Sequence, residues 1–129
     1  MTYYIQISTT DWPKDKLLFE DTINTLEKLC DIESGYIFNE PVSKFGWTFI
    51  DMILKGDFHM SVEQEFVEQV NKSKGSKPEE KFINFLVKYL ENNGCKIKLM
   101  LKKMENLFRL QINLRRQIMM MNYDILYSN

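Results

Sequence analysis

The sequence has little of what most catalytic and metal sites need. Its 129 residues include one histidine, two cysteines, five glycines and no alanine. One histidine and two cysteines are too few for a Cys/His metal cluster. The glycines stand singly along the chain, so neither a phosphate-binding loop nor a dinucleotide-binding fingerprint can form. These absences exclude many enzyme classes, and we expect no cofactor and no metal.

The chain also lacks a recognisable secretion or membrane signal. Its first residues have no basic stretch, and Gln6 and Ser8 interrupt the apolar ones. The longest unbroken apolar run, 118–121, is far shorter than the roughly 18 residues that a membrane span requires. We therefore expect a cytoplasmic protein in which Cys30 and Cys95 are reduced, buried thiols.

Charge is unevenly distributed although the net charge is only −1. Residues 1–70 contain 13 acidic and 5 basic side chains, whereas residues 71–129 contain 5 acidic and 12 basic ones. Such an asymmetry bears on partners and on electrostatic steering, and not on the fold. Either the two halves neutralise each other in the folded protein, or one of them faces a charged partner.

The first third of the chain predicts a strand, a long helix and a short strand. Residues 2–8 are rich in aromatic and branched side chains, which favour a strand. Residues 14–31 have the spacing of an amphipathic helix. Its apolar face consists of Phe19, Ile23, Leu26 and Cys30. A second, short strand is predicted at 36–38, where Pro41 limits its length.

The middle of the chain allows two interpretations of its first part. Ser43 can cap a helix that ends at Gly56, and residues 47–54 can instead form a strand. The apolar residues that would share the face of that helix are Phe45, Phe49, Met52 and Ile53. Farther along, Ser61-Val62-Glu63-Gln64 has the form of a capping box, which predicts a helix from there to about Asn71.

The last part begins with a second capping box and ends in an ambiguous segment. Ser76-Lys77-Pro78-Glu79 predicts a helix that ends at 92–94. Beyond it, alternating residues favour a hairpin of strands 95–101 and 108–114 that turns at 103–106, with a third strand within 122–127. The same residues also fit one unusually long helix.

The predicted fold class is α+β, in a single domain that spans residues 1–129. An antiparallel sheet, made of the N-terminal strand and the C-terminal hairpin, packs with three to four helices. A mostly α fold with a long C-terminal helix is the alternative.

The single histidine offers little for catalysis. In Asp57-Phe58-His59, the carboxylate and the imidazole would share a side only in extended backbone, and no nucleophile is marked beside them. We interpret His59 as a loop histidine close to the next helix. Acidic pairs such as Glu63 and Glu65 fit a helix start better than a magnesium site. We therefore expect a protein that is not an enzyme.

The basic second half is the strongest sign of nucleic-acid binding, because clustered cations release counterions from a phosphate backbone. Lys96, Lys98 and Lys102 share one face of the first predicted C-terminal strand. Arg109 and Arg115 are in phase on the second. The sequence pI of about 5.9 is nevertheless well below the basic value of a dedicated binder. A small nucleic-acid-binding or regulatory domain is thus the alternative function.

The acidic first half has the composition of a protein-binding surface. Aromatic residues stand among its carboxylates, at Trp12, Tyr36, Phe38, Trp47 and Phe58. Aromatic side chains serve as desolvated anchors, and surrounding carboxylates steer a basic partner. The residues that we predict to bind a partner are Trp47, Asp51, Asp57, Glu65 and Glu68.

In this profile the chain resembles small bacterial immunity proteins, which neutralise the nuclease domains of colicin-like or contact-dependent growth inhibition toxins. The resemblance rests on length, on the absence of catalytic motifs and on the acidic stretch Asp51 to Glu68. It implies an inhibitor that occludes the active or substrate-binding surface of a basic toxin domain. The positive second half departs from this profile.

Overall fold

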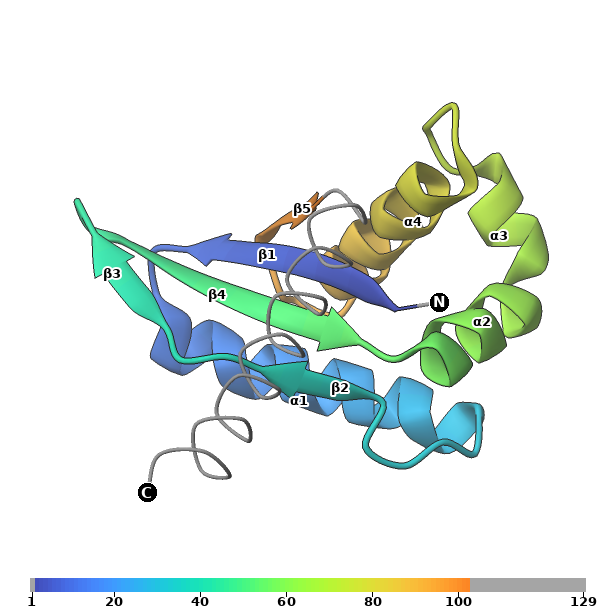
Figure 1. Ribbon diagram of the computed structural model, residues 1–129, viewed down its shortest axis with the longest axis horizontal. Coiled ribbons are helices and arrows are strands. Elements are labelled where there is room, and N and C mark those ends of the chain that lie inside the picture. The colour runs from blue at the N-terminus through green and yellow to red at the C-terminus, as the bar shows by residue number, and fades with distance from the viewer. Residues whose placement is uncertain (1, 103–129) are drawn as a thin grey trace, which may run out of the picture.

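The computed structural model describes residues 2–102, which form an α+β arrangement (Figure 1). The strands of this part of the chain are β1 (Tyr3–Thr9), β2 (Tyr36–Phe38), β3 (Val42–Lys44), β4 (Trp47–Leu54) and β5 (Lys98–Leu101). Its helices are α1 (Trp12–Leu29), α2 (Gly56–Glu65), α3 (Val67–Lys72) and α4 (Pro78–Asn92). None of these helices is long and apolar enough to cross a bilayer.

The strands pair into one antiparallel sheet with the order β2-β4-β1-β5. β1 lies between β4 and β5, and it pairs with β4 over its whole length. β3 and β2 both pair with the other side of β4, β3 along its first residues and β2 along its last. The predicted antiparallel sheet and its N-terminal strand are confirmed.

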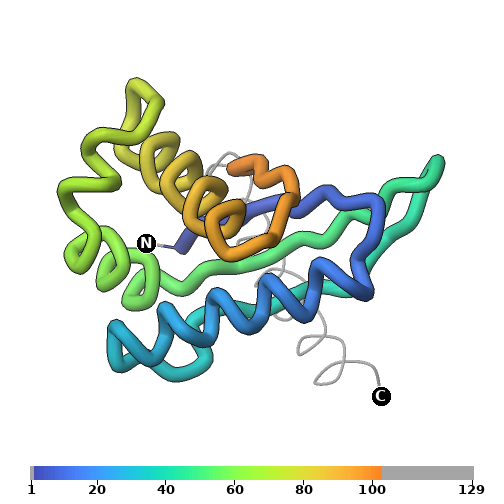
Figure 2. Tube along the Cα trace, turned by 180° about the vertical axis from the view of Figure 1, so that it is seen from behind, coloured from blue at the N-terminus to red at the C-terminus, as the bar shows by residue number. Residues whose placement is uncertain are grey.

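Alternation along the strands gives the sheet an inner and an outer face. The fully buried inner residues of β1 and β4 are Ile5, Ile7, Ile50, Met52 and Leu54. α1 and α4 lie side by side over this face, as Figure 2 shows from behind. Their buried residues include Phe19, Ile23 and Leu26 of α1 and Phe82, Leu86 and Leu90 of α4. The predicted apolar face of α1 is thus confirmed, except that Cys30 is only half-buried beyond its end.

Residues 42–54 form a hairpin, so the helix predicted from Ser43 to Gly56 is wrong and the strand alternative is correct. Phe45 and Gly46 join β3 to β4 with φ angles of 54° and 80°. Positive φ at both loop residues is what a tight type I′ hairpin requires. The alternation of β4 then places its buried side chains opposite those of β1.

The helix predicted to begin at Ser61 begins earlier, at Gly56. Ser61 lies inside α2, where its Oγ donates to the carbonyl of Asp57 at 2.7 Å. It therefore caps nothing. β4 leads into α2 through Lys55, which occupies the N-cap without a side-chain hydrogen bond, so the true start carries no capping signal.

The predicted helix to Asn71 is divided in two at Phe66, where φ is −114° and ψ is 35°. This break directs the Phe66 ring onto α4. Its centroid lies 5.3 Å from that of Phe85 and 5.7 Å from that of Tyr89. The aromatic cluster fixes α3 against α4.

α4 begins at Pro78 and ends at Asn92, close to the prediction, but its first turn uses a different glutamate. The backbone N–H and the Oγ of Ser76 lie 3.0 and 3.2 Å from Oε2 of Glu80. The backbone hydrogen bond from Ser76 is the main cause that lowers the pKa of Glu80. The predicted capping box is therefore wrong: Lys77 occupies the N-cap without a side-chain hydrogen bond, and Ser76, one residue before it, donates to Glu80.

The Glu80→Gln variant should be less stable than the wild type at neutral pH. Because folding lowers the pKa of Glu80, its stabilising effect is present above the unfolded value of 4.5 and is lost as the pH falls through the folded value. Urea unfolding should show a difference in the free energy of unfolding between the wild type and Glu80→Gln that is smaller at about pH 3 than at about pH 7. Ser76→Ala keeps the backbone N–H that donates to Glu80, so it should lose less stability than Glu80→Gln. An equal difference in the free energy of unfolding at both pH values would contradict this explanation.

β5 confirms only the second half of the predicted strand 95–101, because it begins at Lys98. Lys98 and Met100 are exposed, and they alternate with the partly buried Leu99 and Leu101. Cys95 and Cys30 are free thiols. The predicted turn at 103–106, the second and third C-terminal strands, Arg109 and Arg115 lie outside the described residues.

Candidate protein-binding site

The five predicted partner-binding residues fall into two separate parts of the surface. Trp47 and Asp51 lie on the outer face of β4, whereas Asp57, Glu65 and Glu68 belong to α2 and α3. α2 follows the far end of β4 (Figure 1), and a strand rises about 3.3 Å per residue, which places Trp47 roughly 23 Å from that end. The residues therefore do not form one continuous site.

On the outer sheet face, the predicted residues already contact the basic segment. Nζ of Lys102 lies 3.0 Å from Oδ1 of Asp51 and 5.0 Å from the centroid of the Tyr4 ring. The Tyr4 hydroxyl donates to Oδ2 of Asp51 at 2.9 Å. Nζ of Lys98 lies 5.0 Å from the centroid of the Trp47 ring. At Asp51 and Lys102 the acidic and basic halves of the chain neutralise each other.

This internal pairing weakens the case for a nucleic-acid surface. Lys98 and Lys102 do lie on one face, as predicted, but an aromatic ring or a carboxylate already engages each of them. A cation that is paired within the protein releases fewer counterions from a phosphate backbone. No contact within residues 2–102 favours the nucleic-acid alternative.

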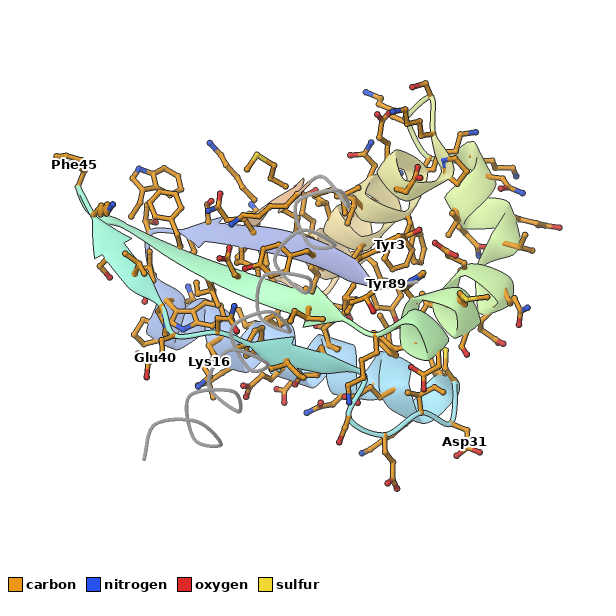
Figure 3. The ribbon with its side chains drawn as sticks, viewed as in Figure 1. Tyr3, Lys16, Asp31, Glu40, Phe45 and Tyr89 are labelled. Carbon is orange, nitrogen blue, oxygen red and sulfur yellow. The ribbon has the colours of Figure 1, made fainter. Side chains whose placement is uncertain are left out.

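The surface of α2 and α3 is different, because its carboxylates have no cation close by. Asp57, Glu65 and Glu68 are exposed, and no basic nitrogen of residues 2–102 lies within 4 Å of them. The acidic surface also reaches the end of α1, where burial and then the charge of Glu65 raise the pKa of Cys30. Asp31, exposed and labelled in Figure 3, follows there.

A groove of about 500 Å³ lies between α2, α3 and the start of α4. Its apolar walls include Met60, Val67 and Pro78, and its charged groups are Glu63 and Lys81. Met60 and Val67 are 52% and 50% exposed. Half-exposed apolar side chains beside a charged rim are typical of a protein interface. We call this feature the α2–α3 groove.

Glu63 is held in the α2–α3 groove by a buried pair of rings. The Tyr3 hydroxyl donates to its Oε1 at 3.0 Å, and Nδ1 of His59 lies 3.7 Å from the same oxygen. The rings of Tyr3 and His59 stack with centroids 3.8 Å apart. Burial, followed by the charge of Glu63, raises the pKa of Tyr3, so the phenol stays protonated and keeps donating. Figure 3 shows Tyr3 at the end of the sheet nearest α2.

The interpretation of His59 as a loop histidine is wrong. His59 lies within α2 and is 2% exposed. Asp57 does not orient it, because Oδ1 of Asp57 accepts the backbone N–H of Phe58 at 2.8 Å. The nearby carboxylate is that of Glu63, one helical turn farther on. This i,i+4 spacing is visible in the sequence, but placing the helix start at Ser61 conceals it.

No family model matches the sequence, and no match is found among curated proteins or solved structures. In residues 2–102, no three His, Cys, Asp or Glu side chains are grouped so that they could hold a metal ion. The site is therefore characterised by its surface chemistry: a fixed carboxylate in a groove, apolar walls and further exposed carboxylates on the same two helices.

Proposed function

We propose that this protein is a non-catalytic, protein-binding inhibitor of the immunity-protein kind, and that it binds a basic partner through α2 and α3. One observation carries the proposal. Exposed carboxylates that have no cation nearby in the described chain lie on the same two helices as the half-exposed Met60 and Val67 of the α2–α3 groove. Apolar anchors at the centre of an interface supply binding energy, and charges around them supply orientation.

A basic partner follows from the charges. Asp57, Glu65 and Glu68 repel one another in the free protein, and a cationic surface would relieve that repulsion while accelerating encounter. A nuclease-type toxin domain fits this requirement, because a protein that binds nucleic acid carries a positive surface. Covering that surface would exclude the toxin's substrate.

Reversing the charge of Glu65 and Glu68 should slow the capture of the basic partner. The double variant Glu65→Lys, Glu68→Lys should associate roughly 10- to 100-fold more slowly at low salt, with a weaker salt dependence, because exposed interface charges act mainly on the association rate. Folding should survive, since both side chains are exposed. The measurement is association kinetics with a toxin domain from the same genome, together with protection of cells that express it.

The matched control carries the same change in net charge elsewhere. Asp21 on α1 and Glu40 before β3 are exposed, and Figure 3 shows Glu40 far from α2. The Asp21→Lys, Glu40→Lys variant should retain most of the wild-type association rate. If both variants slowed association equally, the effect would come from net charge alone and not from the position of the charges. Unchanged capture by the Glu65/Glu68 variant, or loss of binding on Lys98→Gln, would contradict the proposed interface.

A further inference from the structure

We propose that the α2–α3 groove accepts an arginine side chain of the basic partner and that Glu63 is the carboxylate that binds its guanidinium group. This inference rests on the proposed function and names the chemistry that the groove recognises. It draws on three independent features: a fixed carboxylate, an imbalance of charge around the groove, and apolar walls that suit a long aliphatic stem.

The carboxylate is fixed before any partner arrives. Oε1 of Glu63 accepts the Tyr3 hydroxyl at 3.0 Å, and the stacked Tyr3 and His59 rings are both almost fully buried. The Glu63 side chain remains 27% exposed, and it lines the groove. An oriented carboxylate loses little conformational entropy on binding. The entropic cost of binding a guanidinium group is therefore smaller than it would be for a mobile carboxylate.

The charges around the groove leave a place for one more cation. Glu79 belongs to the first turn of α4, next to Pro78 of the groove, and its charge, like that of Glu63, raises the pKa of Tyr3. Oε2 of Glu79 is buried and accepts no hydrogen bond from residues 2–102. Lys81 is the groove's own cation, but its Nζ donates to the carbonyl of Asn71 at 3.2 Å and forms no ion pair with either glutamate.

The walls suit arginine better than a compact cation. Met60 and Val67 are half exposed at the groove, and Val70 and Pro78 continue its apolar lining. The methylene stem of arginine packs on such surfaces while its head reaches a carboxylate. Its planar group also forms paired hydrogen bonds that a lysine ammonium cannot form. The volume of about 500 Å³ lies within the roughly 300 to 1,000 Å³ of pockets that hold small ligands.

The test is a titration of the full-length protein, followed by NMR, with the blocked tripeptide acetyl-Gly-Arg-Gly-amide. The backbone amide signals of Met60, Glu63 and Val67 should shift with millimolar affinity. The citrulline peptide, which has the same shape without the charge, should bind at least tenfold more weakly. Equal shifts with citrulline, equal affinity for the lysine peptide, or shifts confined to another surface would overturn the assignment.

Two variants distinguish the contribution of the Glu63 carboxylate to binding from that of the neighbouring charge of Lys81. Glu63→Gln should weaken binding of the arginine peptide about tenfold. Lys81→Gln, which removes the groove's own cation, should strengthen it two- to threefold. Unchanged affinity in Glu63→Gln, or weaker binding in a Lys81→Gln variant whose amide spectrum shows the wild-type fold, would overturn the inference.

These results can be distinguished from failure of the proposed function. If Glu63→Gln loses the arginine peptide but retains full affinity for the toxin domain, then the partner does not use the groove, and only this inference falls. If the peptide binds as expected but the Glu65/Glu68 reversal leaves toxin capture unchanged, then the proposed interface falls and the arginine site stands.

Discussion

Replacing Phe82 by alanine should lower the free energy of unfolding by about 3 to 5 kcal/mol. Phe82 is 1% exposed, and its ring centroid lies 5.5 Å from that of Tyr3 and 6.0 Å from that of His59. α4, β1 and α2 meet at this side chain. A cavity at a junction of three elements cannot close by moving one of them, so the penalty should be in the upper part of the range for such truncations.

Urea unfolding followed by circular dichroism measures this loss, and Lys88→Ala on the exposed side of α4 is the control. Lys88 is exposed, and its truncation should change stability by no more than about 0.5 kcal/mol. If Phe82→Ala lost less than about 1.5 kcal/mol, the packing of α4 on the sheet would have to be revised.

Replacing Gly35 by alanine should destabilise the protein by about 1 to 3 kcal/mol, as overpacking of a core does. A Cβ atom at Gly35 would lie 2.6 Å from Cγ of Phe58, which is itself 1% exposed. The backbone at residue 35 cannot easily move away from Phe58, because both the N–H and the carbonyl of Gly35 are hydrogen-bonded. The N–H of Gly35 donates to Oε2 of Glu27 at 3.0 Å, and its carbonyl accepts the N–H of Lys55 at 2.9 Å.

A double-mutant cycle identifies the clash as the cause. Phe58→Ala removes Cγ and Cδ2, two of the three atoms nearest to the new Cβ, so Gly35→Ala should lose about 1 kcal/mol less in the Phe58→Ala background than in the wild type. Thermal and urea unfolding of the four proteins would measure this coupling. Additive losses would instead point to a conformational requirement at Gly35.

Local sequence patterns were sufficient to predict an element where that element buries only one of its faces. α1 could be predicted because its core-facing Phe19 and Ile23 alternate with a solvated row, so the helical period is visible. β4 could not be decided in this way. Phe49 and Ile53 are apolar residues on its outer face, and they mask the alternation that Ile50 and Met52 would otherwise show. Its turn, Phe45-Gly46, also differs from the usual Asn-Gly signal.

The candidate site was only half predictable for a related reason. Glu65 and Glu68 are exposed, as the helical row in the sequence indicates. Glu63 fits a capping box in the sequence, but its actual partner is Tyr3, 60 residues away in the chain. A contact of this kind depends on how β1 and α2 pack, which no local spacing encodes. The pairing of Asp51 with Lys102 was hidden in the same way, because the register of β1 with both its neighbours creates it.

The central position of β1 has a consequence for biosynthesis. Ile5 of this strand pairs with Leu101 of β5, which is synthesised 96 residues later. At a translation rate of about 5 to 20 residues per second, β1 waits about 5 to 20 s for this neighbour. During that interval one edge of the strand has backbone groups that can pair with another nascent chain. The sheet is completed only after β5 has emerged, and until then pairing between nascent chains competes with pairing to β5.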